Sequence, residues 1–383
     1  MSIETTVTRA WQRQAAWLWL LLPISWLYGL ITTLRRQAYK AGLLASYRAP
    51  VPVMVIGNIS VGGSGKTPLI IALVDYLQER GIKVGVISRG YGGDTSQMPA
   101  LVDAASLPNV VGDEPCLIVN MTNAPMAVCP DRKQAIMTLL AAHPDLQFII
   151  ADDGLQHYAL QRDIEWIVVD SARGFGNQQL LPTGFLREPM SRLQGATVIY
   201  HEPLTTDSVD KNKDNSNLYR AHRLTMHLEA DALQLLWQPT LSYSQIDAPK
   251  KGCRVHAVSG IGYPQRFFDT LNSLGFDVVG HAYPDHHDFE LAELLQYTEY
   301  PIVVTSKDAV KIRALLSKAT TDKALNNEYQ TLINRLWVLP VTAELSDSCY
   351  DNLQQQLKKL GIDIANNDNT NNSANNNTKA NNR

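Results

Sequence analysis

The residues from Gly57 to Pro68, GNISVGGSGKTP, have the types and spacing of a phosphate-binding loop. They fit the pattern G-x-x-x-x-G-K-[ST] except at its first place, where Ser60 stands. Glycines let backbone N–H groups approach phosphate oxygens, the lysine reaches the β- and γ-phosphates, and the last hydroxyl ligates Mg²⁺. We therefore expect ATP and Mg²⁺ as cofactors. The predicted loop comprises Ser60, Val61, Gly62, Gly63, Ser64, Gly65, Lys66 and Thr67.

A loop of this kind needs an acidic residue at the end of a neighbouring strand to organise the metal ion. The apolar run Phe148–Ala151 ends in Asp152 and Asp153, where open α/β sheets bind their ligands. Successive side chains of an extended chain point in opposite directions, so the two carboxylates have different tasks. We expect Thr67 and these acids to form the metal site; a pair of loop-capping acids is the alternative interpretation.

Three further clusters contain residues that suit the acceptor side of a phosphoryl transfer. Asp113 stands between Gly112 and Glu114-Pro115, in a fixed turn, and its carboxylate can take a proton from a hydroxyl. The second cluster is LPTGFLREP (181–189), in which Arg187 has the planar guanidinium fork that holds phosphate. The third cluster is Tyr283–Phe289, with His286 in its centre. Taken singly, the three clusters also fit ordinary turn acids, a surface Arg–Glu pair and a solvent-facing loop. A metal site in the third is disfavoured, because adjacent residues rarely coordinate one ion together.

Short apolar strands alternate with helical patterns on both sides of these motifs. Near-continuous Val/Ile strands separated by helices indicate a mostly parallel sheet covered on both faces. The expected fold is therefore α/β and P-loop NTPase-like, with a second, smaller α/β lobe and an N-terminal hydrophobic helix. The expected divisions are an N-terminal membrane-anchor region (1–48), a P-loop core (49–201), a connector (202–250), a C-terminal α/β lobe (251–362) and a disordered Asn-rich tail (363–383).

The N-terminal region contains twenty residues without a charge, from Ala15 to Leu34, with several tryptophans. Such a stretch is long enough to cross a hydrocarbon core, and tryptophan favours the membrane interface. A signal peptide is disfavoured because no small-residue cleavage site follows; a buried helix remains an alternative. Basic residues after the stretch, among them Arg35 and Arg36, place the rest of the chain on the cytoplasmic side. The net charge of −3 gives no sign of a nucleic-acid partner.

The motifs occur in an order that resembles the tetraacyldisaccharide 4'-kinases, the lipid A kinases of Gram-negative bacteria. The resemblance covers roughly residues 10 to 345. It departs slightly at Phe185, where the family usually has proline or another small residue, and Ser60 agrees with the serine or threonine common there in the family. The motifs are GNISVGGSGKTP (57–68), SRGYGG (88–93), GDEP (112–115), DDGLQH (152–157), LPTGFLREP (181–189), PDHHDF (284–289) and TSKDAVK (305–311).

The resemblance implies transfer of the γ-phosphate of ATP to the 4'-hydroxyl of a tetraacylated disaccharide 1-phosphate, giving lipid IVA. It implies that Asp113 accepts the proton, that His286 pairs with it, and that Lys66 acts on the phosphate. The implied location is the cytoplasmic face of the inner membrane, where the acylated substrate lies. The implied contacts to substrate or phosphate come from Arg89, Glu114, Arg187 and Glu188. Two other classes remain as rivals: a P-loop NTPase switch coupled to a membrane partner, and a non-enzymatic adaptor.

Overall fold

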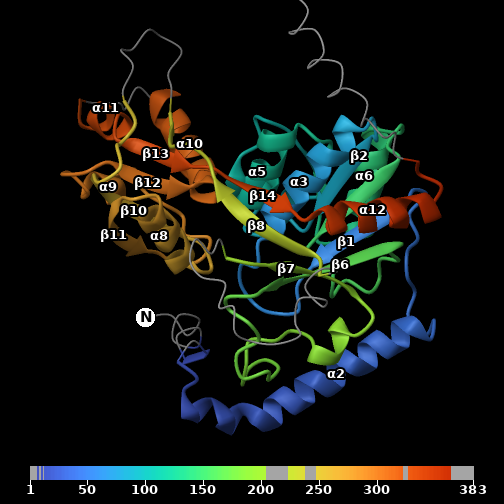
Figure 1. Cartoon of the computed structure of the whole chain (residues 1–383). Helices are drawn as coiled ribbons and strands as arrows, with labels where there is room; N and C mark the ends of the chain where they lie inside the picture. The colour runs from blue at the N-terminus through green and yellow to red at the C-terminus, as the bar shows by residue number, and fades with distance from the viewer. Residues whose placement is uncertain are drawn as a thin grey trace, which may run out of the picture.

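The computed structural model describes Val7, Ala10, Trp11 and residues 13–203, 223–237, 247–321 and 327–363. These residues form a larger and a smaller α/β lobe, with a long N-terminal helix along one edge of the molecule (Figure 1). The two lobes contain separate sheets of nine and five strands. Both are mostly parallel, as the sequence predicts.

The sheet of the larger lobe has the strand order β14-β8-β7-β6-β1-β5-β2-β4-β3. All neighbours are parallel except at the two edges, where β3 and β14 run antiparallel to their partners. The carboxyl ends of β1 and β5, which carry the phosphate-loop and acidic motifs, are therefore adjacent. The strands are β1 Val53–Gly57, β2 Val84–Ser88, β3 Ala100–Val102, β4 Met126–Val128, β5 Phe148–Asp152, β6 Ile164–Asp170, β7 Thr197–His201, β8 Thr225–Ala230 and β14 Val341–Leu345.

Helices cover both faces of this sheet, because alternate strand residues point to opposite sides. Met54 and Ile56 of β1 belong to the core under α3, α5 and α12, whereas Val53 and Val55 face the core under α6. The helices of this lobe are α3 Lys66–Glu79, α4 Pro108–Val111, α5 Asp113–Thr122, α6 Arg132–Ala142 and α12 Asp347–Lys359, with short 3₁₀ turns at η2 Thr95–Gln97 and η3 Met190–Leu193.

The smaller lobe has the strand order β11-β10-β12-β13-β9, with only β9 antiparallel. Its longest helix, α10, packs against α5 of the larger lobe. That contact brings two segments far apart in sequence to one cleft. The elements are β9 Gln234–Leu235, β10 Arg254–Ser259, α8 Pro264–Ser273, β11 Asp277–Ala282, α9 Leu291–Leu295, β12 Ile302–Thr305, α10 Ser306–Thr321, α11 Asn327–Ile333 and β13 Leu336–Leu339.

The lobe boundaries differ from the predicted ones. The run 336–341 looks like one strand, but Pro340 separates β13 of the smaller sheet from β14 of the larger one. Helix α12 also returns to the larger lobe, because Cys349, Leu353 and Leu357, spaced four apart, bury against its core. The predicted connector likewise includes β8 of one sheet and β9 of the other. The predicted tail, from 364 onward, lies outside the described residues.

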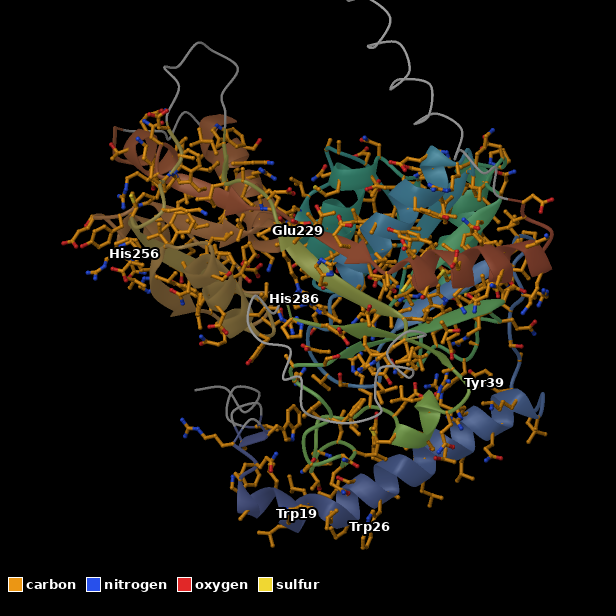
Figure 2. The ribbon with its side chains drawn as sticks, in the orientation of Figure 1. Trp19, Trp26, Tyr39, Glu229, His256 and His286 are labelled. Atoms are coloured by element: carbon orange, nitrogen blue, oxygen red, sulfur yellow. The ribbon has the colours of Figure 1, made fainter. Side chains whose placement is uncertain are left out.

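The N-terminal helix consists of the 3₁₀ turn η1 Ala16–Leu21 and the α-helix α2 Leu22–Lys40. Among the described residues, this stretch alone is long and apolar enough to cross a membrane. It touches the body on one side, where Ser25 Oγ donates to Leu180 O at 3.0 Å and Tyr28 Oη to Arg187 O at 3.1 Å. Only 11% of its most apolar part is buried, which excludes the alternative of a core helix. Trp19 and Trp26 point away from the body (Figure 2).

Candidate active site

The phosphate loop connects β1 to α3, as the strand–glycine turn–helix pattern predicts. Gly62 and Gly65 have φ values of 97° and 90°, the left-handed region that side chains rarely adopt. A Cβ on Gly62 would lie 2.6 Å from Nη1 of Arg173, which donates a hydrogen bond to the carbonyl of Val61. The loop therefore needs glycine both for its backbone shape and for the close approach of Arg173.

Lys66 begins α3, and its ammonium group lies at the mouth of the loop. Its Nζ is 3.2 Å from Oδ1 of Asn58 and 3.3 Å from Oδ1 of Asp153. Both partners hold the cation beside the helix N-terminus, where backbone N–H groups also favour an anion. Lys66 and Thr67 line the cleft together with Ser64, which is itself buried.

The two acids after β5 have different surroundings, as the opposite directions of successive side chains predict. Asp152 is fully buried, and Ser88 Oγ donates to its Oδ2 at 3.0 Å, while its Oδ1 has no hydrogen-bond partner in the structure. Burial raises the pKa of Asp152 to about 7, with Glu114 and Asp153 adding to the effect. The buried, unpartnered Oδ1 is the kind of hard oxygen that a divalent cation accepts.

Asp153 turns toward the cations instead. Its φ of 46° is unusual for a residue other than glycine and directs the carboxylate between Lys66 and Arg187. Arg187 Nη1 donates to its Oδ2 at 3.2 Å. Burial alone would raise the pKa of Asp153, but Lys66 and Arg187 outweigh it and lower the pKa to about 2. Asp153 is thus an ionised carboxylate placed between two cations.

Asp113 opens α5, next to Gly112, whose φ is 97°. Its Oδ1 accepts from the backbone N–H of Glu114 at 2.9 Å, and its Oδ2 lies 3.0 Å from Nδ1 of His286. Burial would raise the pKa of Asp113, but the hydrogen bond from His286 and the charges of Lys307 and Lys311 hold it well below its usual range. Asp113 is therefore ionised at neutral pH.

The partners of Asp113 come from the smaller lobe, at the boundary that His286 marks in Figure 2. Lys311 Nζ lies 3.2 Å from Oδ2 of Asp113, and Lys307 Nζ lies 3.1 Å from Oε1 of Glu114. The ring of Tyr91 also packs on His286, with centroids 4.8 Å apart. Asp113 is almost fully buried behind these groups, so it borders the cleft without lining it.

One cleft of about 1140 Å³ joins most of the predicted residues. It is lined from the larger lobe by the phosphate loop from Val61 onward and from the smaller lobe by the loop before α8 and the start of α10. Ser60 lies just outside, bridged to Leu186. The other sequence-predicted residues that line it are Arg89, Glu114, Asp152, Asp153, Arg187 and His286.

Glu188 is the predicted substrate residue that the structure places elsewhere. Its carboxylate is buried away from the cleft and accepts from Gln156 at 2.9 Å and from Arg192 at 3.1 Å. Because neighbouring residues of an extended segment point in opposite directions, Arg187 faces the cleft and Glu188 faces the interior. The prediction of a substrate contact for Glu188 is therefore corrected to an internal ion pair.

Sequence reasoning missed four residues that support this site. Lys307 and Lys311 lie four apart on α10, a spacing that places both on one face, so the TSKDAVK motif contained the signal. Ser88 stands at the start of SRGYGG. Arg132 is buried and donates to the carbonyl of Asp152 at 2.8 Å, which fixes the end of β5. Within the described part of the chain, no three His, Cys, Asp or Glu side chains gather as a metal-binding group.

The fold and the cleft together define a P-loop kinase of two lobes. A model of the family "Tetraacyldisaccharide-1-P 4'-kinase" matches residues 17–358. The chain therefore belongs to the tetraacyldisaccharide-1-P 4'-kinase family. It is an enzyme of ATP-dependent 4'-phosphorylation in lipid A biosynthesis, and the rival interpretations as a switch or an adaptor are wrong.

Relatives named tetraacyldisaccharide 4'-kinase match most of the chain. A tetraacyldisaccharide 4'-kinase of Psychrobacter cryohalolentis is 70% identical over 372 residues, which are 95% of this chain and 99% of the relative. One of Pseudomonas putida is 42% identical over 314 residues, covering 82% of this chain and 89% of the relative. The fold is similar to the crystal structure of LpxK from Aquifex aeolicus in complex with ATP. That match has a TM-score of 0.62 and 24% identity, and it covers 90% of this chain and 99% of the other.

Proposed function

We propose that the cleft transfers the γ-phosphate of ATP to the 4'-hydroxyl of tetraacyldisaccharide 1-phosphate, giving lipid IVA, with Asp113 as the proton acceptor. The observation that carries this assignment is the ionised Asp113, which His286 and Lys311 of the smaller lobe contact beside the phosphate loop of the larger lobe. A sugar hydroxyl has a very high pKa, so a carboxylate near the developing alkoxide accelerates transfer. The low pKa of Asp113 makes it a weak base, which suits a loose transition state that needs little proton removal early.

The donor side is proposed to work mainly by alignment and charge. Lys66 moves from Asp153 and Asn58 to the β- and γ-phosphates, a short shift for a flexible side chain. Thr67 and Asp152 would hold Mg²⁺, and Asp153 would be a further ligand; the unpartnered Oδ1 of Asp152 supports this set. When bound, Mg²⁺ neutralises charge on the phosphate oxygens.

The acceptor side is proposed to use the remaining cations of the cleft. Arg89 and Arg187 line it and offer planar N–H donors to phosphate oxygens of either substrate. Glu114 is paired with Lys307 and acts by placing that lysine. Because His286 and the two lysines cover Asp113, the acceptor hydroxyl reaches it through a shift of the smaller lobe.

Asp113→Asn tests the assignment. We expect kcat to fall by about 10²- to 10⁴-fold, the usual range for a general base, while the affinity for ATP stays near normal. Asp145→Asn is the matched control, since Asp145 forms only an exposed pair with Lys83 at 2.8 Å. Near-normal turnover of Asp113→Asn in a lipid-phosphorylation assay would disprove the role of Asp113.

We further propose that α2 holds the enzyme at the cytoplasmic face of the inner membrane, lying in the interface and not crossing the bilayer. Contacts of Ser25 and Tyr28 with the body, near the middle of the whole apolar stretch Ala16–Lys40, support this orientation, because a perpendicular span would break them. The side opposite these contacts exposes a band of large apolar residues. They are Leu20, Ile24, Trp26, Leu27, Leu30, Ile31 and Leu34.

A further inference from the structure

The side chain of His286 is fixed on both ring nitrogens at the boundary of the two lobes (Figure 2). Its Nδ1 lies 3.0 Å from Oδ2 of Asp113, and its Nε2 lies 3.2 Å from Nζ of Lys307. The backbone is also held, with a φ of 59° and the N–H of His286 donating to Gly260 O at 3.1 Å. The ring therefore has one orientation, and the protons on its two nitrogens depend on these two neighbours.

Lys307 has three acceptors for three hydrogens. Besides His286, its Nζ contacts Oε1 of Glu114 at 3.1 Å and Oδ1 of Asp285 at 3.3 Å. An ammonium group has three N–H donors and no lone pair. Burial would lower the pKa of Lys307, but Glu114, Asp113 and Asp285 outweigh it and raise the pKa above its usual value. Each N–H thus has its own acceptor, and the third of these is a ring nitrogen.

A nitrogen that faces an ammonium group must accept a hydrogen bond, so Nε2 keeps its lone pair. A nitrogen that faces an ionised carboxylate must donate, so Nδ1 has the proton. We propose that Lys307 is a positioning residue that keeps His286 as the neutral ring with its single proton on Nδ1, directed at Asp113. The inference rests on the proposed function, because it gives Asp113 a fixed donor on Oδ2. The other oxygen, Oδ1, accepts only the backbone N–H of Glu114 and keeps capacity for the acceptor hydroxyl.

Without Lys307 the surroundings of the ring would be acidic. Asp113 would remain at Nδ1, and Asp285, whose Oδ1 is 3.8 Å from Nε2, would face the other nitrogen. Two carboxylates favour the doubly protonated imidazolium. Repulsion between Lys307 and a charged ring excludes that form in the native protein. The lysine therefore decides the number of protons on the ring as well as their place.

Nitrogen-15 NMR of the histidine-labelled protein tests the inference directly, because protonated and unprotonated ring nitrogens have widely separated shifts. The chain has 9 histidines, and loss of signals in His286→Gln assigns the ring. We expect a protonated Nδ1 and an unprotonated Nε2 in the native enzyme at neutral pH. A proton on Nε2 would overturn the inference, whatever the activity.

Lys307→Met should give two protonated nitrogens, and Lys307→Arg, which keeps the cation, should restore the native pattern. Lys311→Met is the matched control: Lys311 also bridges to Asp113 but has no contact with the ring, so the ring should stay singly protonated.

We also expect Lys307→Met to lower kcat by about 10- to 10²-fold with little change in the KM for ATP, as for a misaligned catalytic group. If the ring of His286 stays singly protonated in Lys307→Met, with ATP binding retained as proof of folding, the role of Lys307 is refuted. Failure of the Asp113 assignment would appear separately, in the Asp113→Asn turnover.

Discussion

Replacing Trp26 by alanine tests how α2 holds the enzyme at a lipid surface. The side chain is 69% exposed and points away from the body (Figure 2). A tryptophan has roughly 200 Å² of surface to bury, so about 140 Å² is free to contact lipid. At about 25 cal/mol per Å², complete burial would contribute about 3.5 kcal/mol.

A helix in the interface sinks only about 5–10 Å into the membrane. We therefore take roughly half of the free energy of complete burial and subtract the contribution that alanine would still make. About 1.5 kcal/mol remains, which corresponds to a roughly tenfold loss of vesicle partitioning. The assay is co-sedimentation with vesicles over a range of lipid concentrations. Trp19→Ala/Trp26→Ala should lose more than Trp26→Ala alone, since both side chains belong to the same exposed side.

Met137→Ala is the control for loss of exposed apolar surface as such. Met137 is 55% exposed but lies on α6, away from α2 (Figure 1). We expect its partitioning to equal that of the native chain. If Trp26→Ala partitions normally, or if Met137→Ala loses as much, the exposed side of α2 is not the membrane-binding surface.

Three other predictions concern the surroundings of single acidic or hydroxyl side chains. Glu188→Gln should destabilise the fold by about 1–3 kcal/mol, because it weakens the pair that the buried Glu188 forms with Arg192, while leaving the KM for the acceptor unchanged; a raised KM with normal melting would restore a substrate role. Ser88→Ala should raise the Mg²⁺ concentration for half-maximal activity about tenfold, since it removes the partner of Asp152, without weakening Mg²⁺-free ATP binding. Burial raises the pKa of Asp308 to about 6 from about 3.9 in the unfolded chain, so stability should fall by about 3 kcal/mol as pH rises between these values. Urea unfolding of Asp308→Asn at pH 4 and pH 7 should show that this loss has disappeared.

The phosphate loop and the acids after β5 could be predicted because their chemistry depends on neighbours in sequence. A strand, a glycine turn and a helix start place Lys66 and Thr67 with no help from the rest of the fold. The same local logic failed for Glu188, where the motif joins Arg187 to a residue that faces the interior. It also failed at Pro340, because two strands of different sheets follow each other without a visible break.

The dyad of Asp113 and His286 depends on tertiary structure, and only the family resemblance indicated it. Strands β8 and β14 pair within the larger sheet, and from there the chain leads into and out of the smaller lobe, whose α10 then packs on α5. That docking places Lys307 and Lys311 around two acids 193 and 198 residues earlier in the chain. Four charged groups and one imidazole satisfy each other only in the docked arrangement. Separation of the lobes would take His286 away from Asp113 and Glu114 away from Lys307, which would keep only Asp285 and His286 of its own lobe. The pairing that keeps Asp113 ionised is thus coupled to the docking of the smaller lobe against the larger one.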